Sequence, residues 1–139
     1  MDETQEIDKW LFALLSKDTV LLPLIGSRIY PDLAPIDAAF PRVIYSVLAA
    51  SDTDSMDMTR NFSKFTYLLQ IYGRDSGFIP LQTIAAQIDH LVHKSKITGV
   101  AQLWKAARCA PPSRNTTLEN DIRTLKIMVS YTVTVQQLN

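Results

Sequence analysis

Three kinds of side chain in this sequence could take part in chemistry: a group of aspartates, a pair of histidines and a single cysteine. Asp52, Asp54 and Asp57 lie within the stretch SDTDSMD, and carboxylates at alternating positions can bind calcium. An EF-hand loop, however, requires glycine at its sixth position and glutamate at its twelfth, where this stretch has Asp57 and Ser63. We therefore interpret the aspartates as a solvated acidic loop, or as an acidic contact with a basic partner.

The histidines and the cysteine lack the companions that a metal site or a nucleophile needs. His90 and His93 can share one face of an expected helix, but zinc requires a third and a fourth ligand. Cys109 lies among small residues in AARCA, which favours a buried thiol over a nucleophile activated by a nearby base. The sequence contains no phosphate-binding glycine loop, no GxSxG and no CxxC. We expect no catalytic residues, no cofactor and no metal.

The composition of the chain favours one intracellular domain over residues 1–139. The length fits a single domain, and 47% hydrophobic residues can form a core. Fourteen basic and fourteen acidic residues give a formal net charge of zero, which disfavours a generic nucleic-acid binder and suits a protein that packs against neighbours. A single cysteine, an acidic N-terminus and the lack of a long apolar run lead us to expect neither secretion nor membrane insertion.

The first half of the sequence predicts a helix followed by two strands. Apolar residues with helical spacing predict an amphipathic first helix that Pro23 and Gly26 end. Residues 26–40 are rich in proline, which predicts a connector held in an extended path. Residues 41–50 and 64–72 read as strands of a hairpin, and the polar residues 51–63 between them read as a long loop.

The second half predicts another helix and two more strands. Pro80 fits the first turn of a helix with an apolar stripe, which is followed by a strand at about 101–109. Residues 110–122 read as a second long loop, and apolar residues at every odd position from Leu125 to Val135 predict a strand with one buried face. The whole pattern predicts an α+β fold, in which two amphipathic helices cover one face of a mostly antiparallel sheet of four to five strands.

The two expected loops carry most of the charged residues that a partner could contact. Basic residues gather in or beside both loops, where they are either ordinary surface charge or a contact for an acidic partner surface or DNA phosphate. We expect the loops to make contacts between subunits or with another protein, because they are longer than the core requires. The candidate interface residues are Asp52, Asp54, Asp57, Arg60, Lys64, Arg114, Glu119, Asp121 and Arg123.

Several short motifs resemble those of a known family. They are Ala13-Leu14-Leu15, then Gly26 and Arg28-Ile29-Tyr30, then Ala34-Pro35 and Phe40-Pro41-Arg42-Val43-Ile44-Tyr45, and later Gln70-Ile71-Tyr72. In this order they resemble the tail-completion and tail-terminator proteins of long-tailed bacteriophages and related prophage particles. The resemblance extends from about residue 6 to residue 137, and its motifs are structural rather than catalytic.

The resemblance implies a structural virion protein, assembled in the host cytoplasm and located in the tail or neck. Such proteins form a ring, typically a hexamer, at the head-proximal end of the tail tube, where they end tube polymerisation and provide a docking surface for the head. The implied partners are other copies of the chain, the major tail tube protein and a head-side connector. The resemblance also implies that DNA passes through the lumen without sequence-specific binding and that no membrane is involved.

Within the connector and the strand after it, five residues are candidate structural anchors: Arg28, Tyr30, Pro35, Pro41 and Tyr45. Arg28 and Tyr30 fit either an anchor or a contact with a neighbouring subunit. The sequence also leaves two other functions open. One is a connector or stopper on the head side of the same joint, and the other is a small enzyme or regulatory domain outside any virion.

Overall fold

The computed structural model describes residues 3–34, 39–54, 60–74, 77–93, 103–119 and 122–136. These residues form three helices and six strands: α1 (Glu3–Ser16), α2 (Leu22–Ile25), β1 (Ile29–Pro31), β2 (Arg42–Asp54), β3 (Arg60–Arg74), α3 (Phe78–Val92), β4 (Leu103–Arg108), β5 (Ser113–Glu119) and β6 (Ile122–Gln136). The predicted α+β class with a mostly antiparallel sheet is confirmed. The sheet has six strands rather than four or five, and α2 is a helix that the sequence did not predict.

All six strands belong to one sheet, with the order β1-β2-β3-β6-β4. β1 is parallel to β2, and the other pairs are antiparallel. β6 pairs with β3 along its length on one side. On its other side β6 pairs with β5 from Ile122 to Met128 and with β4 from Tyr131 to Val135. The sheet therefore ends in β1 and β2 at one edge and in β4 and β5 at the other.

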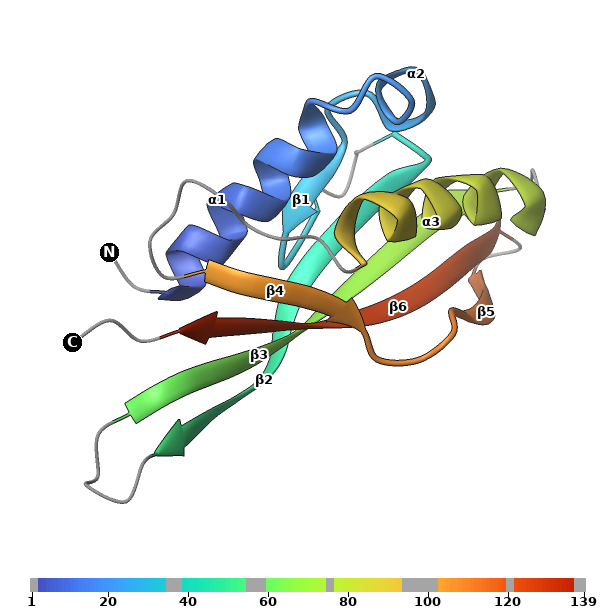
Figure 1. Cartoon of the computed structure of the whole chain (residues 1–139). Helices are drawn as coiled ribbons and strands as arrows, with labels where there is room; N and C mark the ends of the chain where they lie inside the picture. Colours follow the sequence, from blue (N-terminus) through green and yellow to red (C-terminus); the bar gives the residue numbers. More distant parts are fainter. Residues whose placement is uncertain are drawn as a thin grey trace.

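The helices cover one face of this sheet, as Figure 1 shows for α1 and α3. The alternation in β6 decides which face is buried, because the odd-numbered residues from Leu125 to Val133 are buried while the described even-numbered ones are partly exposed. From the helix side, α3 contributes Leu81, Ile84, Ala85, Ile88 and Val92 to the same core. Within the described residues, no helix is long and apolar enough to cross a membrane.

The turn from β3 into α3 depends on a close approach between the strand and the helix. A Cβ atom at Gly73 would lie 2.7 Å from a methyl carbon of Leu81, whose side chain is fully buried. Gly73 therefore lets the first turn of α3 pack directly on the end of β3. Pro80 is the third residue of α3, where the missing backbone donor costs no helical hydrogen bond.

The connector between α1 and β2 is more structured than a simple extended path. Pro23 lies in the first turn of α2, so it begins a short helix rather than only ending one. Residues Ile29–Pro31 then pair in parallel with Val43–Tyr45 as β1. β1 is not predicted from the sequence, because three residues are too few for a pattern and the pairing depends on the fold around them.

Candidate functional site

The first group of predicted interface residues lies on a strand hairpin and not in a loop, so the expected loop over 51–63 is wrong. β2 continues to Asp54 and β3 begins at Arg60, with Asp52 opposite Ser63 and Asp54 opposite Arg60. We call residues 47–54 of β2 and 60–66 of β3 the arm. Figure 1 shows that its end projects away from the three helices. Asp57 lies outside the described residues.

The second group lies beside a strand as well, and the expected loop over 110–122 is also wrong. Residues Ser113–Glu119 form β5, which pairs with the start of β6 so that Arg114 is opposite Ile127. The described side chains of β5 are all exposed, and Arg123 at the start of β6 is exposed too. The guanidinium of Arg114 donates to the side-chain oxygen of Gln82 and lies 5.3 Å from the ring of Phe78. Glu119 ends β5, and Asp121 lies outside the described residues.

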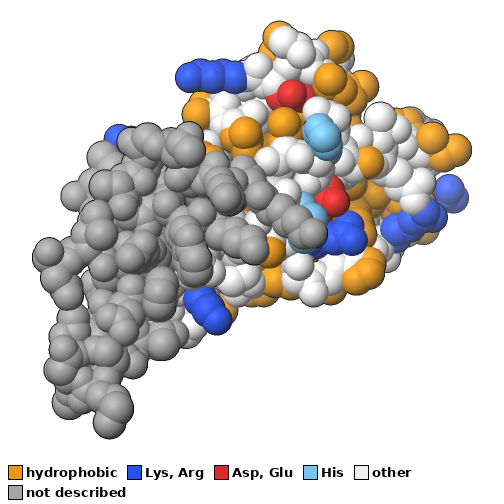
Figure 2. All heavy atoms as spheres, viewed as in Figure 1, with side chains coloured by type: hydrophobic (Ala, Val, Ile, Leu, Met, Phe, Trp, Pro, Cys, Tyr) orange, Lys and Arg blue, Asp and Glu red, His pale blue; other side chains and the backbone are white. Residues whose placement is uncertain are grey.

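The structure keeps these two groups apart within one subunit. The arm includes part of β2 at one edge of the sheet, whereas β5 lies at the opposite edge, with β3 and β6 between them. Any contact between the arm and β5 must therefore join two different subunits. Figure 2 shows that exposed hydrophobic side chains lie over α2 and near the start of α3 on the helical face, which agrees with the exposure of Leu22 and Ile79.

Four of the five candidate anchors lie where the connector meets β2. Arg28 donates from Nε to the carbonyl oxygen of Pro41 at 2.8 Å and from Nη2 to that of Leu24 at 3.3 Å, so it joins α2 to the residues that enter β2. Pro41 follows a cis peptide bond. Tyr45 is buried, whereas Tyr30, which is opposite Ile44 in the pairing of β1 with β2, is partly exposed. Pro35 lies outside the described residues.

Sequence reasoning missed a group of cations and aromatic rings at the other end of the arm's strands. We call Phe40, Arg42, Tyr72, Arg74 and Lys126 the cation–aromatic stack. The guanidinium carbons of Arg42 and Arg74 lie 4.3 Å and 4.4 Å from the centre of the Phe40 ring. The guanidinium carbon of Arg42 and the ammonium nitrogen of Lys126 lie 5.7 Å and 5.8 Å from the centre of the Tyr72 ring.

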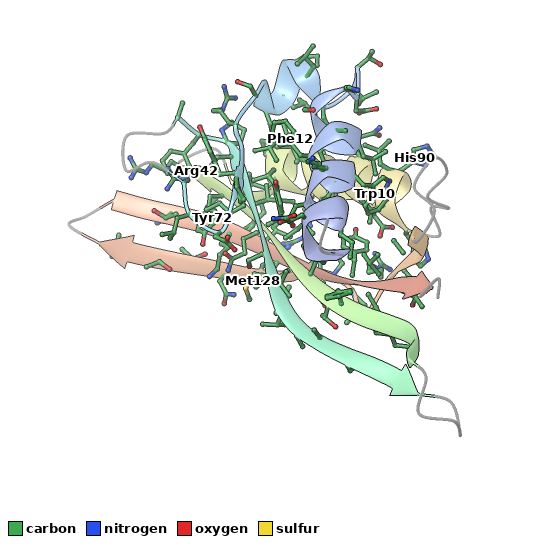
Figure 3. The ribbon with its side chains drawn as sticks, turned by 90° about the vertical axis from the view of Figure 1, so that its left-hand side faces the viewer. Trp10, Phe12, Arg42, Tyr72, His90 and Met128 are labelled. Atoms are coloured by element: carbon green, nitrogen blue, oxygen red, sulfur yellow. The ribbon has the colours of Figure 1, made fainter. Side chains whose placement is uncertain are left out.

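The stack spans neighbouring strands because Arg42, Tyr72 and Lys126 are aligned across β2, β3 and β6. Figure 3 shows Arg42, Tyr72 and Met128 together and away from α1, which carries Trp10 and Phe12. The hydroxyl of Tyr72 donates to Gln70 at 3.2 Å, which fixes the ring that two of the cations face. The sequence does contain a signal, because Phe-Pro-Arg and Tyr-Gly-Arg both place an aromatic residue two positions before an arginine at the end of a strand. Only the register of the two paired strands shows that these residues meet.

A buried tyrosine and an ion pair connect α3 with β4 and β6. The hydroxyl of Tyr131 donates to Asp89 at 3.0 Å, and the other oxygen of Asp89 lies 3.6 Å from Arg108. Arg108 also donates its backbone N–H to Nδ1 of His93 at 2.9 Å. Asp89 and Arg108 border a cavity of about 370 Å³ beside Gln82 and Arg114. Because Asp89 of α3 binds both Tyr131 of β6 and Arg108 of β4, the cluster helps to fix α3 on the sheet.

Two tyrosines in the core have raised pKa values. Burial raises the pKa of the Tyr131 hydroxyl far above its usual range, and the neighbouring Asp89 raises it further. Burial also raises the pKa of Tyr45, with smaller contributions from Asp8 and Asp32. In both cases the neutral hydroxyl is the form that the fold favours.

We expect the free energy of unfolding to fall above pH about 10 because the unfolded chain then loses tyrosine protons that the folded protein keeps. Tyr131 contributes its full stabilisation below that pH, and its contribution decreases by up to about 1.4 kcal/mol per pH unit above it. Urea unfolding of the wild type and of Tyr131→Phe between pH 8 and pH 11 measures this slope. An unchanged slope in Tyr131→Phe would contradict the assignment.

The remaining candidates for chemistry do not form a site in the described part of the chain. His90 is exposed in the last turn of α3, whereas His93 follows the helix and accepts the hydrogen bond from Arg108. The expectation of a buried Cys109 is wrong, because β4 ends at Arg108 and the thiol is exposed, 3.0 Å from the Thr132 hydroxyl. Among the described residues, no group of three or more histidine, cysteine, aspartate or glutamate side chains could hold a metal ion.

The described residues thus form an α+β fold with a mixed six-stranded sheet, helices on one face and a projecting arm. The sequence matches the family described as "Tail completion protein gp17" over residues 9–136. The match covers most of the chain, so the chain belongs to this family. The family supports a structural role in tail completion, as a component of a phage or phage-like virion that assembles with other virion proteins.

Solved structures agree with this fold. A chain from the virion of a native gene transfer agent particle superposes with a TM-score of 0.69 at 16% identity, covering 91% of this chain and 92% of that one. A second structure, whose description states no function, gives a TM-score of 0.57 at 15% identity and covers 99% of both chains. At these identities the likeness shows the fold. No protein among the curated sequences matches the chain.

Proposed function

We propose that the protein forms a ring, with six subunits as the expected number, at the head-proximal end of the tail tube. The ring ends tube polymerisation and presents the surface on which the head docks. Membership of the tail-completion family supports a place in the tail, and the resemblance to tail terminators supports this position within it. The proposed role is mechanical and requires no chemical step.

The observation that carries the ring is the presence of uncovered strand edges on opposite sides of one sheet. β1 covers β2 only from Val43 to Tyr45, so the rest of β2 has a strand neighbour on one side only within the described residues. β5 likewise pairs with β6 alone in that part of the chain. Edges of this kind invite pairing with another chain, and two different patches on one subunit support head-to-tail contacts that can close into a ring.

We propose the charged residues of the arm and of the β5 hairpin as the contact residues of this ring and of the tube. In this proposal, residues 1–139 form a single tail-terminator-like domain. Its partners are neighbouring copies, the major tail tube protein and the head-side connector, and double-stranded DNA passes through the lumen without sequence-specific binding. Assembly takes place in the host cytoplasm, and the finished ring remains in the neck of the virion.

Defective particles made without this protein test the proposal against a stopper on the head side. If the protein ends tube growth, its loss leaves overlong or unjoined tails beside filled heads in electron micrographs. Heads that leak DNA beside tails of normal length would instead assign it to the head side of the joint. Light scattering of the purified protein provides a second test, because a monomer that never binds tail tubes contradicts the ring.

A further inference from the structure

The face of the sheet opposite the helices, which we call the open face, carries most of the cation–aromatic stack. In β3 and β6 the buried core residues are odd-numbered, so the even-numbered Tyr72, Arg74 and Lys126 leave their strands on the open face. Arg42 is directly opposite Tyr72 and therefore belongs to the same face. Figure 3 agrees with this assignment, since Arg42 and Tyr72 lie away from the labelled residues of α1.

The cations of the stack are available to an anion. Neither Arg74 nor Lys126 has a carboxylate within ion-pair distance in the part of the chain that the structure describes. The carboxylates whose side chains are described lie beside side chains of the core or of α3 instead, and they are Asp8, Asp18, Asp32 and Asp89. Among the described side chains, the open face thus carries cations without carboxylates, although the chain has a formal net charge of zero.

β5 extends the open face with uncharged groups that form hydrogen bonds. Asn115 is directly opposite Lys126, and Ser113 and Thr117 lie two residues before and after it, so all three side chains share the orientation of Lys126. Each of the three is exposed. In protein–DNA complexes, side chains of these types contact phosphate groups together with arginine, lysine and tyrosine. The surface therefore has the composition of one that binds a phosphate backbone.

The arrangement of this surface favours DNA over an acidic protein as its partner. Arg42 and Lys126 belong to strands that are two apart in the sheet, so their backbones lie about 10 Å from each other and the cations form a broad row. The rings of Phe40 and Tyr72 lie against these cations and do not form an apolar centre. A protein interface has such a centre, whereas a DNA-binding surface is more polar and more positively charged.

We propose that the open face lines the lumen of the ring and that the cation–aromatic stack binds the phosphate groups of the DNA inside it. This inference rests on the proposed function for the position of the DNA, and on Arg42, Arg74 and Lys126 for the contact itself. Phosphate contacts carry no direct information about the base sequence, so the DNA is held without sequence preference. The contact depends strongly on salt and allows the DNA to slide.

Binding of a short fluorescent duplex DNA to the purified protein, followed by anisotropy between about 0.05 M and 0.2 M salt, tests the contact. The stack variant carries Arg74→Gln and Lys126→Gln. We expect it to bind at least about tenfold more weakly than the wild type at about 0.1 M salt, and to do so equally for duplexes of different sequence. The plot of log K against log salt should become less steep by about 0.9 for each lost phosphate contact.

The control variant carries Lys9→Gln and Lys17→Gln, which remove the same charge from the exposed side of α1 and should leave DNA binding unchanged. Thermal unfolding shows whether both variants fold. Acetylation of the wild type, located by mass spectrometry, gives a measurement that needs no variant, because duplex DNA should protect Lys126 and leave Lys9 and Lys17 reactive. If the stack variant unfolds, this protection decides.

Other results would contradict the assignment of the stack to DNA. A wild type that does not bind duplex DNA at about 0.05 M salt, or a stack variant that binds as the control does, would contradict the contact. Both results would leave the ring intact, since light scattering measures assembly without DNA. A stack variant that keeps DNA binding but no longer assembles or binds tail tubes would assign the stack to an acidic protein surface. A wild type that never assembles, alone or on tubes, would contradict the ring and with it the lumenal position of the stack.

Discussion

Ile88→Ala is expected to lower the free energy of unfolding by about 2 to 5 kcal/mol. Ile88 is 1% exposed on the face of α3 that packs on β3 and β6, so its truncation leaves a cavity in the centre of the core. The loss combines the transfer free energy of the removed methyl and methylene groups with the packing that the cavity forfeits. Urea unfolding followed by circular dichroism measures the change.

Ile79 provides a matched control on the same helix, because it is 78% exposed. Ile79→Ala should change the free energy of unfolding by less than about 0.5 kcal/mol. Equal losses in the two variants would show that α3 does not present the stripe from Leu81 to Val92 to the sheet. The pair therefore tests the orientation of the helix and not only its presence.

Shortening the arm is expected to abolish ring assembly while the subunit stays folded. Ser51 and Lys64 are directly opposite each other, so an Asn-Gly turn can join them in place of residues 52–63. Among the residues whose burial the structure describes, the buried part of the hairpin begins at Phe65 on β3 and ends at Tyr45 on β2, and all of it remains. The variant therefore loses contact surface and keeps its described core.

Light scattering and thermal unfolding, measured on the same preparation, separate the two effects. We expect a monomer whose melting temperature lies within a few degrees of the wild type, because a change of about 1 kcal/mol shifts the midpoint by only a few degrees at this chain length. A variant that still assembles but melts much earlier would mean that the arm stabilises the subunit and makes no contact with other copies.

The parts of the fold that the sequence predicts are those in which one face is buried and the other is not. The alternation from Leu125 to Val133 predicted β6, and the apolar stripe from Leu81 to Val92 predicted α3. In both cases the core selects a side-chain pattern with the period of the element. The class of fold follows from these elements together with the hairpin.

The missed strands have no such pattern. Every described side chain of β5 is exposed, so nothing in SRNTTLE alternates, and the strand exists because its backbone pairs with β6. The far ends of β2 and β3 are mostly polar in sequence, which predicts a loop although their backbones pair. Composition identifies a strand by what it buries, and a pattern of this kind does not display backbone pairing.

The candidate site could be predicted only in part. The charged residues of the arm and of β5 were identified from their position between patterned segments, and the structure places those that it describes on β2, β3, β5 and β6. The cation–aromatic stack was missed because Arg42, Tyr72 and Lys126 come from three strands that are distant in sequence. Their meeting is a consequence of register, which a single sequence does not display.

The central position of β6 has a consequence for how the subunit is made. β6 follows every other element along the chain, yet it joins β3 to both β4 and β5. During synthesis, the emerging chain can form the hairpin of β2 and β3 but cannot close the sheet until residue 136 has left the ribosome. A chain that stops before β6 leaves β3 uncovered and β4 and β5 without their described pairing. Because of this order of elements, a copy that lacks β6 cannot complete its sheet and therefore cannot assemble with other copies.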